Sequence, residues 1–165
     1  MPDANGSCTI RECANEILRA MEKHGDSQDK LRASLLQAAN KLMDRPDFTS
    51  LGVKYKPNHV PEGTYLFYDG ELSITFTRLP EGKNVPPHDH GIWEAVIIHS
   101  GKLRHIVYER TDDQTREGYA KLAVTDVVTI GKPCRQGRQK RQTNTICARL
   151  IHPLAYRLSM VQCRR

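Results

Sequence analysis

The sequence lacks the features of a membrane or secreted protein. Its 165 residues contain no uninterrupted apolar run of about eighteen residues, the length that a membrane-spanning helix needs. The first residues also lack the order of a secretory leader, in which positive charge precedes an apolar stretch. We therefore expect a cytoplasmic protein without a membrane partner. The length suits one domain with a core of useful size.

Cysteine is scarce and irregularly spaced. The five cysteines include no Cys-x-x-Cys pair, and an odd number without such pairs argues against a disulfide framework or a zinc ribbon. Reduced thiols are therefore expected. Cys8 and Cys13 are predicted on a helix face, whereas Cys134, Cys147 and Cys163 fall near the C-terminal end.

Acidic residues are missing from the C-terminal part, since no Asp or Glu follows Asp126 while lysines and arginines continue to the end. The net charge of +6 at pH 7 therefore comes from the tail, and the residues before it are mildly acidic. A basic tail without interleaved aromatics can bind phosphates nonspecifically. A solvated, irregular tail is the favoured interpretation, so nucleic acid is not an expected partner.

Two amphipathic helices are predicted before any strand. Apolar residues recur at helical spacing from about Thr9 to His24, and Gly25 provides a stop. A second stripe follows the N-cap candidate Ser27 and ends near Met43. Both stripes are expected to cover one face of a β-structure rather than to form a groove for a partner.

From residue 51 onward the apolar spacing changes to that of strands. After a predicted loop over 51–62, strands are expected at 64–68, 72–78, 92–99 and 103–109, with one or two more within 119–130. Asp69-Gly70 suits a tight hairpin turn. The order predicts an α+β chain in one domain, with an N-terminal helical segment (1–50), an antiparallel barrel core (51–131) and a basic C-terminal tail (132–165).

The stretch 82–101 contains the residues with the clearest chemistry. His88 and His90 are two apart, so in an extended segment both imidazoles point to the same side. Glu94 follows at the same parity and can add an oxygen ligand if the strand continues inward or bulges. Two imidazoles and one carboxylate with open positions suit non-haem Fe(II), although Zn, Mn and Ni accept similar donors. The alternative is that both histidines are surface residues of a loop.

This stretch resembles the first signature motif of the cupins. It reads as glycine, five residues, His-x-His, three residues, Glu, six residues and glycine, from Gly82 to Gly101. The longer string from Tyr65 to Arg110, which includes Pro87-His88-Asp89-His90-Gly91, is similar to the cysteine dioxygenase-like, or thiol dioxygenase, branch. The resemblance implies a small cupin-type β-barrel, a double-stranded β-helix, with a metal site in its mouth.

The resemblance also implies a function. Fe(II) held by His88 and His90, with Glu94 as a further ligand, would act with O2 on a small polar substrate, with thiols included. His105, on the strand after the motif, is a pocket residue if that strand face points inward, although an exposed or packed histidine is equally expected. Two other functions stay open: a noncatalytic metal- or small-molecule-binding cupin, and an inactive degenerate copy with a basic tail.

The chain departs from the family pattern where cupins take a third histidine ligand from a second motif. Residues 131–142 contain no histidine and no apolar alternation. Either His152 serves from a displaced strand, or His88, His90 and Glu94 hold the metal alone, or the coding frame shifted near Lys132 and replaced the native end. The third alternative is favoured, because acidic residues and strand periodicity disappear together there.

Two further departures concern the substrate and the iron. The arginine with which cysteine dioxygenases hold the substrate carboxylate has no counterpart in residues 65–68, which puts cysteine itself in doubt as the substrate. Thiol dioxygenases also generally lack a carboxylate at the position of Glu94 and bind iron through three histidines. Among the other motif residues, His99 is expected in a turn and Trp93 in the core.

Overall fold

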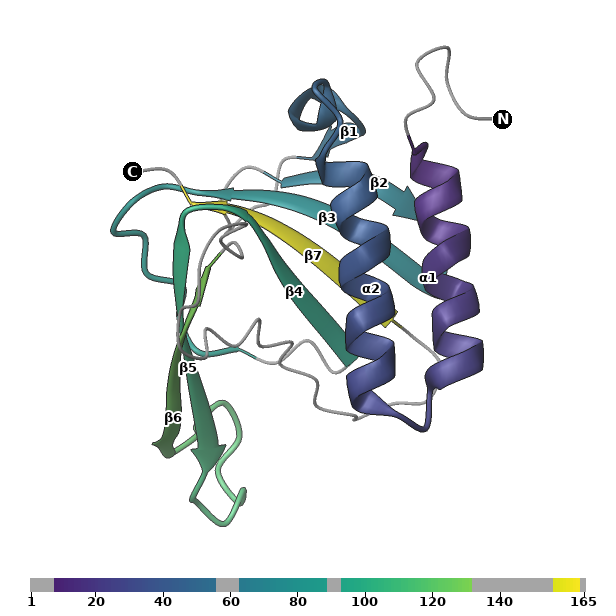
Figure 1. The fold of residues 1–165 in the computed structure, drawn as a ribbon. Helices are drawn as coiled ribbons and strands as arrows, with labels where there is room; N and C mark the ends of the chain where they lie inside the picture. Colours follow the sequence, from purple (N-terminus) through teal and green to yellow (C-terminus); the bar gives the residue numbers. More distant parts are fainter. Residues whose placement is uncertain (1–7, 56–62, 89–92, 132–155, 164–165) are drawn as a thin grey trace, which may run out of the picture.

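The computed structural model describes residues 8–55, 63–88, 93–131 and 156–163, and for Tyr55 and residues 156–163 it describes the backbone alone. The helices are α1 (Ile10–His24), α2 (Gln28–Met43) and the short 3-10 helix η1 (Phe48–Ser50). Figure 1 shows them with the described strands, which are β1 (Val53–Tyr55), β2 (Gly63–Tyr68), β3 (Leu72–Leu79), β4 (Trp93–Ser100), β5 (Lys102–Arg110), β6 (Leu122–Gly131) and β7 (Tyr156–Cys163).

Helix α1 begins with a capping box. The Thr9 hydroxyl accepts a hydrogen bond from the Glu12 backbone N–H at 3.1 Å, and the Thr9 backbone N–H donates to the Glu12 carboxylate at 2.8 Å. Both donors would otherwise lack an intrahelical partner. Ser27 precedes α2 as predicted, but its side chain makes no capping hydrogen bond. Gly25 ends α1 at the predicted place in a right-handed conformation, with φ −52°.

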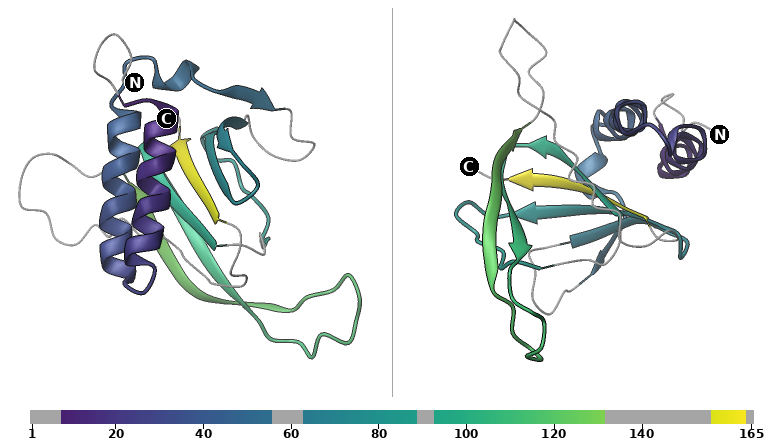
Figure 2. Two further views of the ribbon diagram at one scale, coloured as in Figure 1. Left: turned by 90° about the vertical axis from the view of Figure 1, so that its right-hand side faces the viewer. Right: turned by 90° about the horizontal axis from the view of Figure 1, so that it is seen from below.

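The described strands form two sheets. One has the order β1-β2-β3-β7-β4, and the other is the two-stranded β5–β6 ribbon. The pairs β1–β2, β2–β3 and β5–β6 are antiparallel, whereas β7 runs parallel to both β3 and β4. The α+β class is therefore confirmed. Among the described strands no barrel closes, and the expected antiparallel arrangement does not hold for β7 (Figure 2).

Strand β7 lies in the tail, for which a solvated, irregular structure was the favoured interpretation. It lies between β3 and β4, and its pairing with β3 runs without a shift from Leu72↔Tyr156 to Leu79↔Cys163. The favoured interpretation of a solvated, irregular tail therefore does not hold for 156–163. Residues 132–155, including His152, lie outside the described residues. A second correction concerns the loop predicted over 51–62. Part of this segment forms strand β1, which pairs with β2.

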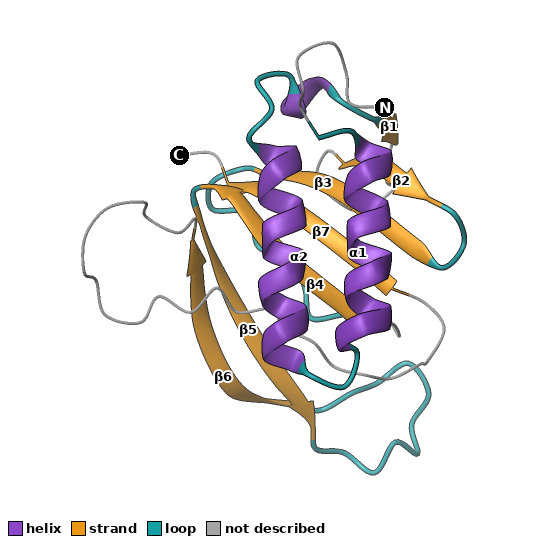
Figure 3. Cartoon of the chain, turned by 45° about the vertical axis from the view of Figure 1, so that its right-hand side comes forward, coloured by secondary structure: helices purple, strands orange, loops and turns teal. Residues whose placement is uncertain are grey.

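Helices α1 and α2 lie side by side across one face of the five-stranded sheet (Figures 1 and 3). Most of the core lies between these layers, and the expected covering role of the helical stripes is confirmed. Its fully buried side chains include Cys13 and Ile17 of α1, Leu35 and Leu42 of α2, Phe48 of η1, and Ile74, Phe76 and Ala95 of the strands. The Phe48 and Phe76 ring centroids are 4.8 Å apart in an edge-to-face contact.

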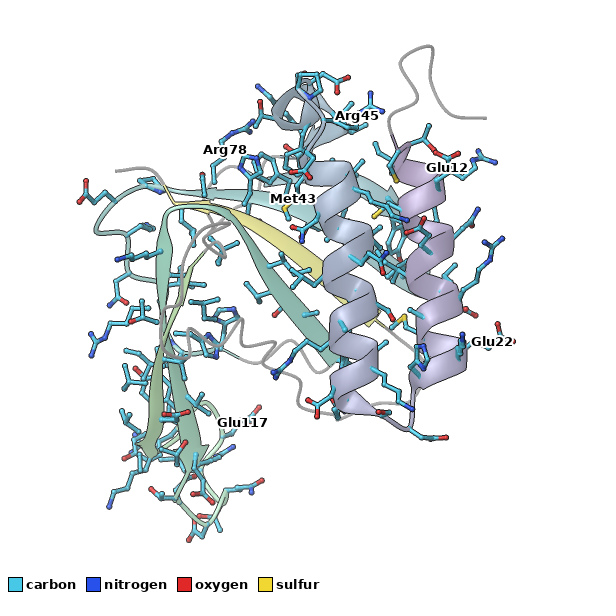
Figure 4. All side chains as sticks on the ribbon, in the orientation of Figure 1. Glu12, Glu22, Met43, Arg45, Arg78 and Glu117 are labelled. Carbon is cyan, nitrogen blue, oxygen red and sulfur yellow. The ribbon has the colours of Figure 1, made fainter. Side chains whose placement is uncertain are left out.

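One hydrogen-bonded cluster joins the ends of the helical layer. Arg45 follows α2, and its guanidinium donates to the Asp47 carboxylate at 2.8 and 2.9 Å and to the Cys8 carbonyl at 3.1 Å. Arg45 thereby ties the chain before α1 to the chain after α2. Figure 4 shows Arg45 and Glu12 at this same end of the helical pair.

The β5–β6 ribbon packs on the opposite face of the sheet near the end of β4. Ile98 of β4 and Ile130 of β6 are buried there, and Leu79, Val96, Leu103 and Val128 pack around them. Farther along the ribbon three large apolar side chains of β6 are exposed: Leu122, Val124 and Val127. The ribbon therefore contacts the sheet at one end and extends away from it (Figure 2).

Candidate metal centre

His88 lies in the loop between β3 and β4. Residues 83–88 of this loop form neither helix nor strand, and the His88 side chain is exposed. Because β4 begins only at Trp93, the strand geometry used to predict paired imidazoles does not apply to His88. His90 lies outside the described residues. The common site for His88 and His90 therefore stays a prediction.

A backbone carbonyl holds the His88 ring. His88 Nδ1 lies 2.8 Å from the carbonyl oxygen of Pro86. A carbonyl oxygen can only accept a hydrogen bond, so Nδ1 must be the protonated, donating nitrogen. In the neutral ring the lone pair then belongs to Nε2, and a ring held in this way matches the usual arrangement of metal-binding histidines. His88 therefore fits a divalent metal as a ligand through Nε2.

Glu94, the second residue of β4, lies on the sheet face opposite the helices. Its neighbours Trp93 and Ala95 are buried in the core under the helices. Val96 and Ile98 pack with the β5–β6 ribbon on the other face, and strand alternation puts Glu94 on their side. Its side chain is half-buried. Glu94 therefore offers a carboxylate oxygen on this face, and its role as a metal ligand stays a prediction.

His105 lies on the face of the ribbon that turns toward the sheet. Its cross-strand partner in β6 is Val128, and the next pair on the same face is Leu103 with Ile130. Those three neighbours belong to the cluster between ribbon and sheet, and directly opposed residues share a face. His105 is half-buried. His105 therefore faces the cluster between ribbon and sheet, and its role as a pocket residue stays a prediction.

The two glycines that bound the motif are both at turns with positive φ. Gly82 follows β3 with φ 70°, and Gly101 joins β4 to β5 with φ 81°. Only glycine adopts such values without strain. Side chains of other residues would be disfavoured at both positions. Glycine turns therefore bound the described parts of the motif, which are residues 83–88 and strand β4.

The described residues do not by themselves assemble a complete metal site. In the described ranges, no group of three or more His, Cys, Asp or Glu side chains could hold a metal ion. His90 and His152 lie outside those ranges. The ligand set of His88, His90 and Glu94 accordingly stays a prediction, as does the alternative through His152.

His99 was predicted in a turn, and this prediction is wrong. Strand β4 continues to Ser100, and the His99 ring centroid lies 5.1 Å from Phe48 and 5.9 Å from Phe76. His99 therefore packs in the layer under the helices. His99 lies an even number of residues after Trp93, which is buried as predicted, so strand alternation puts both on the same face of the sheet. This spacing was the signal in the sequence for a packed His99.

The thiols near α1 are not activated nucleophiles. Burial raises the pKa of the Cys13 thiol to about 12, and burial also raises the pKa of Cys8. A thiol with a raised pKa carries little thiolate at neutral pH. Cys13 also points its sulfur at the Ala38 carbonyl oxygen, at 3.6 Å, inside the core. These two cysteines therefore have a packing role, in agreement with the expected reduced state.

The Pro86 carbonyl, which holds the His88 ring, was not among the predicted groups of the site. The signal for it was the Pro-Pro pair directly before the histidine, because two restricted backbone angles fix the direction of the carbonyl between them.

Comparison with models of protein families, with curated proteins and with solved structures gave no match. The resemblance to the cupins therefore rests on the motif residues themselves. Among the described helices, none is long and apolar enough to cross a membrane.

Proposed function

We propose that this chain is a cupin-type, metal-dependent cytoplasmic protein that acts as a non-haem Fe(II) dioxygenase on a small polar substrate, with thiols included. The observation that carries the proposal is the placement of the motif. His88 lies in the segment between β3 and β4, and Glu94 of β4 lies on the sheet face opposite the helices. The glycine turns at Gly82 and Gly101 support the same motif assignment.

The finer fold in this proposal is a double-stranded β-helix. The helices cover one face of the five-stranded sheet, and the β5–β6 ribbon packs on the other face through Ile98 and Ile130. In a β-barrel the strands surround a shared interior, and residues alternate between inside and outside along each strand. Glu94 and His105 would then both lie on inner faces.

In this proposal His88 and His90 supply imidazole nitrogens and Glu94 a carboxylate oxygen, with His152 as a further candidate. Bound Fe(II) would supply the oxygen chemistry, and Zn, Mn or Ni would accept the same donors. The chain orients and shields the site. Val96 and Ile98 extend the Glu94 face as an apolar surface that limits access of water. His105 can donate or accept a hydrogen bond to a polar substrate.

Metal content and oxygen uptake test the proposal together. Protein purified without chelators is analysed for bound metal, and the variants are His88→Ala, Glu94→Ala and the control His24→Ala. His24 lies in the last turn of α1, outside the motif residues 82–101. We expect His88→Ala to lower retained metal at least about tenfold, Glu94→Ala to lower it less, and His24→Ala to leave it unchanged.

The outcomes separate the alternatives. Bound iron with substrate-dependent oxygen uptake supports the dioxygenase. Bound metal without turnover supports the noncatalytic metal-binding cupin. Equal metal content in wild type and His88→Ala contradicts the site, and a metal-free, aggregating product supports the degenerate copy.

A further inference from the structure

The loop before His88 contains two consecutive prolines, and the structure connects them to the histidine ring. We propose that Pro86-Pro87 is a positioning unit. In this unit the Pro86 carbonyl holds His88 as the Nδ1–H tautomer and so presents Nε2 to the metal. The metal part of the inference rests on the proposed function. The tautomer is a property of the metal-free chain and can be tested without it.

The observed contact is the 2.8 Å hydrogen bond from His88 Nδ1 to the Pro86 oxygen. Only one residue, Pro87, separates donor from acceptor. Its ring holds φ near −65°, and the residue before a proline is kept out of the helical region. Pro86 is itself a proline, so its φ is restricted as well. The direction of the Pro86 carbonyl is therefore largely set by local sterics.

The restriction of the backbone angles of Pro86 and Pro87 matters because the His88 side chain is exposed. In water a free imidazole exchanges its proton between the two nitrogens, and solvent competes for the carbonyl. A flexible backbone would lose conformational entropy each time it formed this contact. The two prolines remove most of that loss in advance. Replacing Pro87 by glycine should therefore release the ring even though neither hydrogen-bonding group is removed.

The tautomer is measured directly in metal-free protein. Long-range proton–nitrogen correlation of nitrogen-labelled histidine distinguishes the two ring nitrogens. We expect wild-type His88 to be predominantly Nδ1–H. In Pro87→Gly the ring should shift toward Nε2–H. The control Pro80→Gly changes a proline of the same loop whose carbonyl accepts from the Lys83 N–H at 3.2 Å, and it should leave His88 unchanged.

Titration with Co(II) tests the consequence for the metal. Pro87→Gly should weaken Co(II) binding about tenfold, as loss of a group that orients a ligand typically does, and Pro80→Gly should bind like wild type. Predominant Nε2–H in wild type overturns the inference, as does a Pro87→Gly variant with unchanged tautomer and affinity. Failure of the wild-type chain to bind Co(II) overturns the proposed function and the metal part of this inference. A wild-type chain that binds Co(II) with unchanged affinity in Pro87→Gly overturns this inference alone.

Discussion

The two faces of the five-stranded sheet differ in what covers them. Under the helices, Leu35, Ile74 and Phe76 are each 0% exposed. On the opposite side the β5–β6 ribbon packs near the end of β4, and Val124 farther along the ribbon is 57% exposed. Because buried apolar area supplies most of the driving force for folding, the helix-covered layer is the stable part of the described structure.

The difference indicates where functional side chains can lie with little loss of folding stability. Glu94 lies on the face opposite the helices, and His88 lies in the segment between β3 and β4. Neither side chain belongs to the core under the helices. Substitutions in the loop and in the helix-covered layer should therefore act almost independently, since distant sites without shared partners have nearly additive effects.

The largest expected effect tests the helix-covered layer. Phe76→Ala removes a fully buried ring that contacts Phe48, and it should lower the free energy of unfolding by about 3–5 kcal/mol. Val124→Ala on the ribbon should lower it by at most about 1 kcal/mol. Urea denaturation followed by circular dichroism measures both. Equal losses of unfolding free energy in the two variants would contradict the expected difference in stability between the helix-covered layer and the ribbon.

An intermediate effect concerns the covering helices themselves. Thr9→Ala removes the capping box of α1 and should cost about 1 kcal/mol of stability. Ser27→Ala is the matched change at the start of α2, where the side chain makes no capping hydrogen bond, so its cost should be near zero. Thermal unfolding of the two variants under one set of conditions compares them. A larger loss in Ser27→Ala would contradict the capping assignment.

The smallest expected effect on stability lies at the end of the ribbon. The Arg110 guanidinium, bonded to both oxygens of Asp112 at 2.8 Å, holds the pKa of that carboxyl well below its usual range. A pKa lower in the folded than in the unfolded state adds stability at neutral pH, and this is lost as pH falls through the folded value. In Arg110→Gln the Asp112 pKa should rise toward its usual value, so the loss begins at higher pH.

An NMR titration of the side-chain carboxyl groups measures this change. The pKa of Asp47, which is lowered by Arg45 in a separate pair, is the internal control and should not move. Because Arg110 is exposed and the pair lies at the far end of the ribbon, the effect on global unfolding should be slight. An unchanged Asp112 pKa would show that its other hydrogen bonds, from the Lys121 and Gln114 backbone N–H groups, are sufficient.

Much of the local structure could be predicted from residue spacing. The two helices begin and end within a residue or so of the predicted places, and β2 to β5 match the predicted strands closely. These elements depend on periodicity and turn chemistry, which neighbouring residues encode. The Asp69-Gly70 turn is an example, with Gly70 at φ 97° and the Asp69 side chain accepting from the Leu72 N–H at 2.7 Å.

The sequence by itself determined the helices, most strands and the motif with His88 and Glu94. Only the tertiary structure decided that β7 lies between β3 and β4, that β1 extends the sheet, and that His99 packs against Phe48. The reason is the range of the interactions. A helix or hairpin is specified by residues a few positions apart, whereas the pairing of Leu72 with Tyr156 brings together segments far apart in the chain. No local period records which distant strand will supply the missing hydrogen bonds.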